Sequence, residues 1–286
     1  QLFGDMPIFV AHDSADVWSA RELFLLDAEG HPLTVAGVPP DYFSADGQRW
    51  GNPHYAWDVM ARDGFAWWRR RIASQRERFD LVRIDHFRGF EACWHIPRES
   101  ASAVHGHWEP APGEALLRAL VAESGDGSLV AENLGIITPQ VERLRERFGL
   151  PGMLILQFAF DGDARNTYLP HNHQPLNVVY TGTHDNDTSL GWFASLDESR
   201  RARVMEYLGM PVEPMPWPLV RAALASVARL AVLPLQDLLG LGSEHRMNLP
   251  GVAQGNWAWQ FCEEQLTPAL AVRLRAMVEL YGRKPS

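Results

Sequence analysis

Short apolar runs alternate with amphipathic stretches along the chain, and the two patterns predict different elements. The apolar runs are rich in Val, Ile, Leu and Phe, which is typical of strands covered on both faces. We therefore predict strands over residues 6–10, 81–85, 129–132, 153–158, 178–181 and 230–235.

Between these runs, apolar residues recur at helical spacing. In the segment 64–79 they form one stripe, made of Phe65, Trp68, Ile72 and Phe79. The segment 138–148 has Thr138 in the N-cap position, Pro139 in the first helical position and Gly149 directly after its end. Further helices are predicted over residues 114–123, 198–208, 218–229 and 268–281.

Alternating strands and helices predict parallel strands joined by crossover helices. A closed (β/α)₈ TIM barrel has eight strands, so we expect an α/β fold of this type that lacks its first strands. Residues 1–286 are interpreted as one partial catalytic barrel domain, because neither a repeat nor a low-complexity linker divides them. The stretch 27–58 has no regular pattern, and its aromatic residues indicate an ordered, functional loop that covers substrate.

Composition excludes several classes of function. Apolar residues make up 46% of the chain, enough for a sizeable core, and the net charge of −9 argues against a nucleic-acid partner. The sequence contains no run of 18 apolar residues, so we predict no membrane span and no membrane partner. Cys93 and Cys262 are interpreted as reduced thiols of a cytoplasmic protein. The start at Gln1, without a signal peptide, is interpreted as a cut through a larger protein.

Three of the predicted strands lead into acidic residues. Asp85 is the last residue of LVRID, Glu132 is the last residue of LVAE, and Asp185 directly follows VVYTGTH. In a parallel barrel these strand ends form the rim where active sites lie. Crowding and burial there raise the pKa of at least one acid, while a neighbouring Arg lowers that of another. Arg83 lies on the same strand face as Asp85. One protonated and one ionised carboxyl group is what glycoside hydrolysis requires.

Several longer strings make the pattern specific. From Gly4 to near its C-terminus the sequence resembles glycoside hydrolase family 77, the amylomaltases or 4-α-glucanotransferases. The strings that carry this resemblance are GDMPIFVA (4–11), PPDYFS (39–44), GQRWGNP (47–53), LVRIDHFRG (81–89), SLVAENLG (128–135), THDNDT (183–188) and RMNLPG (246–251).

The resemblance implies a role for each of the three acids. Asp85 would be the nucleophile, Glu132 the acid/base, and Asp185 the residue that holds the 2- and 3-hydroxyls of the sugar. Tyr42 and Phe43 would lie on the loop that covers the cleft in the family. Other substrate contacts implied by the resemblance are Asp5, Trp50, Asn52, Arg83, His184 and Asn248. From the sequence pattern alone we add Asp161, which follows a predicted strand.

The resemblance implies a retaining enzyme that transfers an α-1,4-glucan segment to the 4-hydroxyl of an acceptor glucan or glucose. Its partners would be maltooligosaccharides or segments of starch or glycogen, and we expect neither a metal nor another cofactor. The pairs His105/His107 and His171/His173 lack a Cys or acid at ligand spacing. Two alternatives stay open: an amylase-type hydrolase with the same three acids, and a non-catalytic glucan-binding fragment, since the chain lacks the long N-terminal portion of the family.

Overall fold

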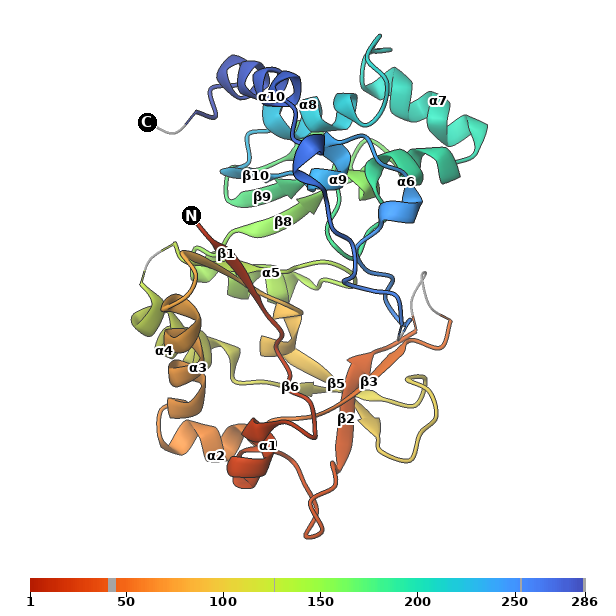
Figure 1. Ribbon diagram of the computed structural model, residues 1–286. Helices are drawn as coiled ribbons and strands as arrows, with labels where there is room; N and C mark the ends of the chain where they lie inside the picture. The colour runs from red at the N-terminus through yellow and green to blue at the C-terminus, as the bar shows by residue number, and fades with distance from the viewer. Residues whose placement is uncertain (41–44, 126, 253, 285–286) are drawn as a thin grey trace. The chain divides into compact units, whose positions relative to one another are not determined.

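The computed structural model describes residues 1–40, 45–125, 127–252 and 254–284. The chain divides into two compact units, unit 1 (Gln1–Gly152) and unit 2 (Met153–Ser286). Each unit has its own strands and helices and its own hydrophobic core (Figure 1). The predicted α/β class is therefore confirmed.

Unit 1 holds a three-stranded parallel sheet of order β1-β4-β7. Its strands are β1 (Phe3–Met6), β4 (Leu81–Ile84) and β7 (Leu129–Ala131). Asp5 pairs with Arg83 across the sheet, and the residues that directly follow β4 and β7 are Asp85 and Glu132. The sheet thus brings four predicted site residues to the carboxyl ends of neighbouring strands.

The first strand lies earlier in the chain than its apolar run predicts. We expected a strand over residues 6–10, whereas β1 ends at Met6. Pro7 has no N–H to donate to a neighbouring strand, which ends the ladder. The apolar residues that follow, Ile8 and Phe9, are buried in the core of unit 1 without belonging to the strand.

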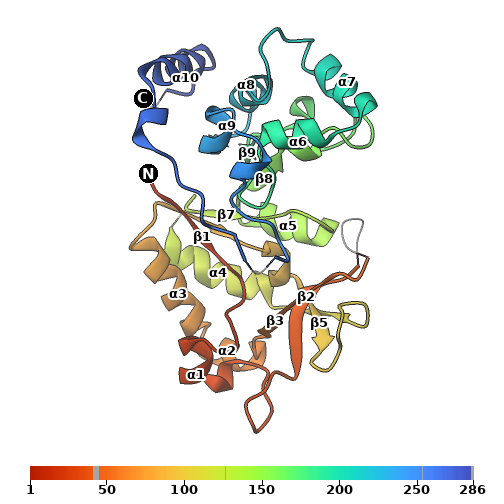
Figure 2. The ribbon, with the colours of Figure 1, turned by 45° about the vertical axis from the view of Figure 1, so that its right-hand side comes forward.

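Helices pack beside this sheet as the apolar periodicity predicts. α3 (Ala66–Arg76) contacts α4 (Gly113–Ser124), and the two lie side by side (Figure 2). Trp68 and Ile72 of α3 are fully buried, which confirms that the predicted stripe faces the core.

The N-terminus of α5 (Pro139–Arg147) also follows the prediction. The Thr138 hydroxyl accepts the Val141 N–H at 3.4 Å. After the helix, Gly149 adopts a φ of 62°, a left-handed conformation that favours glycine. A helix N-cap and a terminating glycine are local signals, so the sequence alone is enough to place them.

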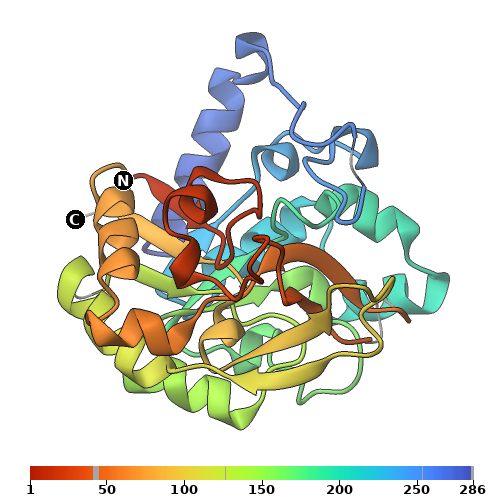
Figure 3. The same ribbon diagram turned by 90° about the horizontal axis from the view of Figure 1, so that it is seen from below.

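Residues 27–58 do not form the irregular loop that we expected. They contribute β2 (Thr34–Val38) and β3 (Gln48–Pro53) to a four-stranded antiparallel sheet of order β3-β2-β5-β6 (Figure 3). The other strands are β5 (Ala92–Pro97) and β6 (His107–Pro110). Thr34 of β2 pairs with Pro97 of β5, which is distant in sequence. The local pattern of residues 27–58 therefore does not show that β2 has this partner. Short helices α1 (Ala15–Ser19) and α2 (Trp57–Arg62) also belong to unit 1.

Unit 2 is built on a three-stranded sheet of order β10-β9-β8, in which β9 and β10 run parallel. The strands are β8 (Gly152–Ile155), β9 (Asn177–Tyr180) and β10 (Leu230–Val232). The helices used below are α6 (Ser189–Ser195), α7 (Glu198–Tyr207), α8 (Trp217–Ala225), α9 (Leu235–Leu238) and α10 (Pro268–Leu280). In the described part of the chain, no helix is both long and apolar enough to cross a membrane.

Three elements in unit 2 end several residues before their predicted boundaries. The strand expected over 230–235 ends at Val232, and Leu235 already begins α9. The strand expected over 153–158 ends at Ile155 and continues as a 3₁₀ helix, η3 (Leu156–Phe158). The helix expected over 218–229 ends at Ala225, where the extended Ser226 accepts the Ala228 N–H through its hydroxyl. In all three places apolar residues continue past the true end, so periodicity alone places the boundary too late.

Candidate active site

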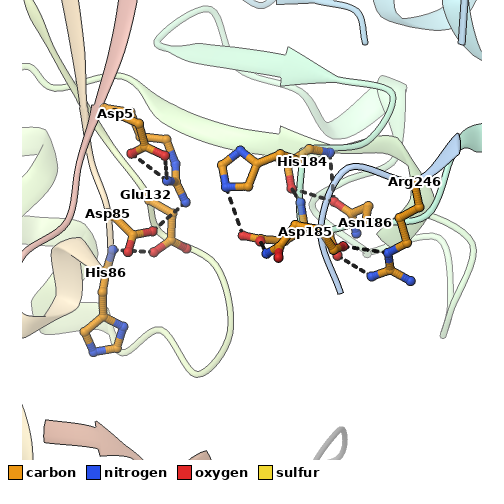
Figure 4. A network of polar contacts seen from close by, with 11 residues as sticks. Asp5, Asp85, His86, Glu132, His184, Asp185, Asn186 and Arg246 are labelled. Carbon is orange, nitrogen blue, oxygen red and sulfur yellow. Dashed lines mark hydrogen bonds and ion pairs between the residues drawn. The ribbon is translucent and has the colours of Figure 1, made fainter. Parts of the chain in front are cut away.

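In unit 1, a single guanidinium joins two carboxylates. Arg83 Nη1 donates to both oxygens of Asp5, at 2.8 and 2.7 Å, and Arg83 Nη2 lies 2.7 Å from Asp85 Oδ1 (Figure 4). Burial disfavours the charge on Arg83, but Asp85, Asp5 and Glu132 favour it more strongly, and the pKa of Arg83 is raised. Arg83 therefore stays protonated and fixes the carboxylate of Asp85 after β4.

The carboxyl group of Glu132 is held in a different environment. The residue is only 8% exposed, and its two oxygens accept the backbone N–H groups of His86 and Leu134, at 2.7 and 2.8 Å. Burial raises the pKa of Glu132 to about 7, with Asp85 adding to the rise and Arg83 and the two N–H groups opposing it. Near neutral pH this acid can hold a proton and release it again.

His86 belongs to this cluster, although sequence reasoning did not assign it a role. It adopts the left-handed conformation with a φ of 50°, which is uncommon for a residue other than glycine. The turn after β4 directs the His86 N–H toward the Glu132 carboxylate, a contact that Figure 4 shows. Its position directly after Asp85 was the available signal, but the sequence does not reveal the backbone conformation.

The two predicted substrate contacts on β3 differ in their surroundings. Trp50 is 38% exposed, and its ring meets the His86 ring edge-on with centroids 4.8 Å apart. The structure therefore brings Trp50 next to a residue that binds Glu132. Asn52 instead donates its side-chain amide to the Val10 carbonyl at 2.9 Å, which ties β3 to the segment after β1.

Unit 2 carries a second polar cluster, built from the segment between β9 and α6 and from residues 246–248. Asn248 Nδ2 donates to Asp185 Oδ1 at 2.6 Å, and His184 Nε2 lies 3.2 Å from Asp185 Oδ2. Three predicted residues thus lie together within this unit. Arg246, which we did not predict, donates from Nη2 to the Asp185 carbonyl at 2.5 Å and from Nε to the Asn248 carbonyl at 2.7 Å (Figure 4).

Further residues support this second cluster without having been predicted. The Asn186 side chain accepts both the N–H and the hydroxyl of Thr183, at 2.8 Å each. The Trp257 ring lies 5.0 Å from the His184 ring, centroid to centroid. Asn186 stands in the string THDNDT, so its proximity in sequence was a usable signal, whereas nothing local in the sequence relates Trp257 to His184.

Three other predicted residues are not brought into either cluster by the described contacts. Tyr42 and Phe43 lie outside the described residues. The side chain of Asp161 is 65% exposed and lies 3.9 Å from Arg200 Nη1 of α7. A substrate contact for these three residues stays a prediction.

The paired histidines of unit 2 already have protein partners. His171 Nδ1 and Nε2 lie 2.9 Å from the Tyr207 hydroxyl and from the Ala164 carbonyl. His173 Nδ1 lies 2.7 Å from the Ser226 hydroxyl, and its Nε2 lies 2.9 Å from the Tyr168 carbonyl. Both pairs of ring nitrogens therefore make structural hydrogen bonds.

Comparison with known proteins places the chain in a family. Residues 1–265 match the family model described as 4-alpha-glucanotransferase, of glycoside hydrolase family 77. A 4-alpha-glucanotransferase of Thermus thermophilus is 55% identical over 291 residues, and that of a Synechocystis species is 53% identical over 287 residues. These alignments cover 99% of this chain but 58% and 57% of the relatives, so the chain spans a little more than half of their length.

A solved structure agrees with the sequence comparison. The amylomaltase from Streptococcus agalactiae in complex with acarbose superposes with a TM-score of 0.96 at 41% identity, covering 100% of this chain and 58% of that chain. The family match covers most of the chain and includes residues of both polar clusters. The chain belongs to the 4-alpha-glucanotransferase family, glycoside hydrolase family 77.

Proposed function

We propose that the complete polypeptide containing residues 1–286 transfers α-1,4-glucan segments to the 4-hydroxyl of an acceptor glucan or glucose, with retention of configuration. The observation that carries this proposal is the pairing of unlike carboxyl groups in unit 1. Asp85 is bound by a guanidinium, whereas burial raises the pKa of Glu132 to about 7. One ionised and one protonated carboxyl group are the two groups that a retaining enzyme uses.

In the first step Asp85 attacks the anomeric carbon and forms an ester bond to the sugar. The glycosidic bond breaks, and Glu132 gives its proton to the departing oxygen, which leaves as a shortened glucan. In the second step the 4-hydroxyl of an acceptor attacks the same carbon and loses its proton to Glu132. The ester bond to Asp85 breaks, so both carboxyl groups return to their starting states.

The remaining groups bind and orient the sugar in this proposal. Asp185 accepts hydrogen bonds from the 2- and 3-hydroxyls, with Asn248 and His184 fixing its two oxygens. Asp5 binds Arg83 through Nη1, while Asp85 contacts Nη2. Trp50 offers an exposed aromatic ring on which a sugar can stack. Roles for Tyr42, Phe43, Asn52 and Asp161 follow from the sequence and stay predictions.

We further propose that the parallel sheets of the two units belong to one (β/α)₈ barrel whose first strands lie outside residues 1–286. Support comes from the alternation of strands and helices and from the amylomaltase similarity, which covers 58% of the neighbour's chain. A cytoplasmic location and a reaction without metal or cofactor stay predictions.

The names of the relatives favour transfer over hydrolysis. The Thermus and Synechocystis proteins are named 4-alpha-glucanotransferases, and the Streptococcus amylomaltase binds acarbose. Hydrolysis uses the same acids but lets water take the place of the acceptor. Whether transfer or hydrolysis occurs depends on whether a sugar acceptor or water reacts with the glucosyl-enzyme first.

Incubation of the complete polypeptide with maltotriose separates these functions. Transfer predicts a ladder of shorter and longer maltooligosaccharides with little gain in reducing ends. Only glucose and maltose, with a matching gain in reducing ends, would identify a hydrolase. Maltotriose binding without any product would identify a binding protein and contradict the proposal.

A further inference from the structure

A buried acid in unit 2 is hydrogen-bonded to both ends of the segment that carries Asp185. Asp237 of α9 is 1% exposed. Asp237 Oδ2 accepts the hydroxyls of Thr181 and Ser189, at 2.5 and 2.7 Å, and Asp237 Oδ1 accepts the Ser189 N–H at 2.7 Å. Three donors thus satisfy one buried carboxyl group, as a buried polar group requires.

These donors stand at the two ends of the segment that carries Asp185. Thr181 directly follows β9, and Ser189 is the first residue of α6. The eight residues 181–188 between these elements include His184 and Asp185. One carboxyl group from a third element, α9, therefore closes this segment at its base.

A second set of contacts fixes the later half of the same segment. Ser243 donates its hydroxyl to Asp187 Oδ2 at 2.6 Å, and Gln157 donates its amide to the Asp187 carbonyl at 2.9 Å. Gly191 leaves room for this pair, because a side-chain carbon there would meet Ser243 and Asp187. With positions 181, 187 and 189 held, the residues between 181 and 187 have little freedom to move.

The neighbour of Asp237 extends the same support to the other half of the cluster. Gln236, also buried, donates its amide to the His245 carbonyl at 3.4 Å. His245 directly precedes Arg246, which binds the Asp185 carbonyl. The short helix α9 therefore contacts both segments that build the Asp185 cluster.

We propose that Asp237 is a positioning residue for the transfer reaction: by binding Thr181 and Ser189 together, it sets the place of the Asp185 carboxylate against the sugar hydroxyls. This inference rests on the proposed role of Asp185. Asp237 touches neither substrate nor reacting atoms in this account. It acts on the transition state through the geometry of residues 181–189, where displacement of a catalytic group by about 1 Å can cost about 10²-fold in rate.

The nature of the contacts makes Asp237→Asn the informative variant. An amide has nearly the same shape as the carboxyl group, but it replaces one acceptor oxygen with an NH₂ donor. Whichever way it turns, the amide NH₂ faces a group that donates to Asp237 in the native structure. Rotated hydroxyls can accept from the amide, so the fold can persist, but neutral hydrogen bonds then replace the charge-assisted ones that hold the two ends of the segment.

The test measures kcat and KM of the complete polypeptide on α-maltosyl fluoride and on its analogue that lacks the 2-hydroxyl at the reacting sugar. The variants are Asp237→Asn, Thr181→Val, Ser189→Ala and Asp185→Asn. We expect Asp237→Asn to lower kcat on the parent substrate about 10- to 100-fold with a smaller change in KM. On the 2-deoxy substrate this loss should shrink, because a contact that Asp185 would make is absent.

Ser226→Ala is the matched control. It removes a hydroxyl in the same unit that contacts His173, and both residues lie outside residues 181–189. It should lower the melting temperature without changing kcat. Equal kcat losses of Asp237→Asn on both substrates would show a merely structural role and overturn the inference. So would wild-type kinetics of Asp237→Asn beside an inactive Asp185→Asn. Full activity of Asp185→Asn would instead overturn the proposed role of Asp185 itself.

Discussion

At the scale of single residues, contact with one guanidinium and burial of one carboxyl group give Asp85 and Glu132 different environments. Arg83 binds Asp85 directly, while Glu132 depends on burial and accepts only N–H groups that lower its pKa without cancelling the rise. The sequence predicted that one acid would be ionised and another protonated, because Arg83 stands two residues before Asp85. It did not predict the His86 N–H contact, which depends on a left-handed residue that no composition rule identifies.

Glu132→Gln tests the proton donor. With a pKa of about 7, Glu132 is protonated below that pH and ionised above it. We expect kcat/KM of the wild type on maltotriose to fall as pH rises through about 7. The substitution should lower kcat/KM about 10²- to 10⁴-fold on maltotriose and much less on α-maltosyl fluoride, because kcat/KM on the fluoride reports only the first step and fluoride leaves without a proton. Equal losses on both substrates would contradict the assignment.

The same raised pKa predicts an effect of pH on folding stability. The folded chain holds a proton on Glu132 that the unfolded chain releases between its usual pKa of 4.5 and about 7. This contribution to stability is therefore present at low pH and is lost as pH rises through that window. Glu132→Gln should melt higher than the wild type at pH 8 and nearly alike at pH 4. Glu123→Gln, on the surface, is a control that we expect to show no such pH dependence.

At the scale of elements, features set by local signals were predictable from the sequence, whereas strands set by long-range pairing were not. Helix ends marked by Thr138 and Gly149 were predicted correctly, because caps and terminators act over a few residues. The strands β2 and β3 were missed, since their residues include Gly and Pro and β2 takes one of its two partners, β5, from a distant segment. The antiparallel sheet they form carries Trp50, so the part of the fold that sequence reasoning missed supports a predicted substrate contact.

Trp50→Ala tests what this sheet presents to substrate. Because the ring is partly exposed and lies beside His86, we expect its loss to favour water over a sugar acceptor. The ratio of hydrolysis to transfer on maltotriose should rise several-fold, with a small change in melting temperature. Trp18→Ala on α1, where the side chain is 83% exposed, is the matched control and should change neither quantity. A large loss of stability with an unchanged product ratio would make Trp50 a core residue.

At the scale of the whole molecule, the strings that indicated the family come from both units, and family membership is confirmed over residues 1–265. The α/β class was predicted correctly, because strands and helices still alternate when each boundary is misplaced by a few residues. It could not group residues distant in sequence, such as Arg246 with Asp185, since such contacts arise only when several elements have packed. The eight-stranded barrel stays a proposal.

If the complete polypeptide acts through a covalent glucosyl-enzyme on Asp85, as we propose, that intermediate can be trapped. The complete polypeptide is treated with 5-fluoro-α-glucosyl fluoride, whose ring fluorine slows the second step, and its peptides are analysed by mass spectrometry. We predict one fluoroglucosyl group on the peptide that contains Asp85, and none in Asp85→Asn. A label on another residue, or turnover with inverted product and no label, would contradict the account.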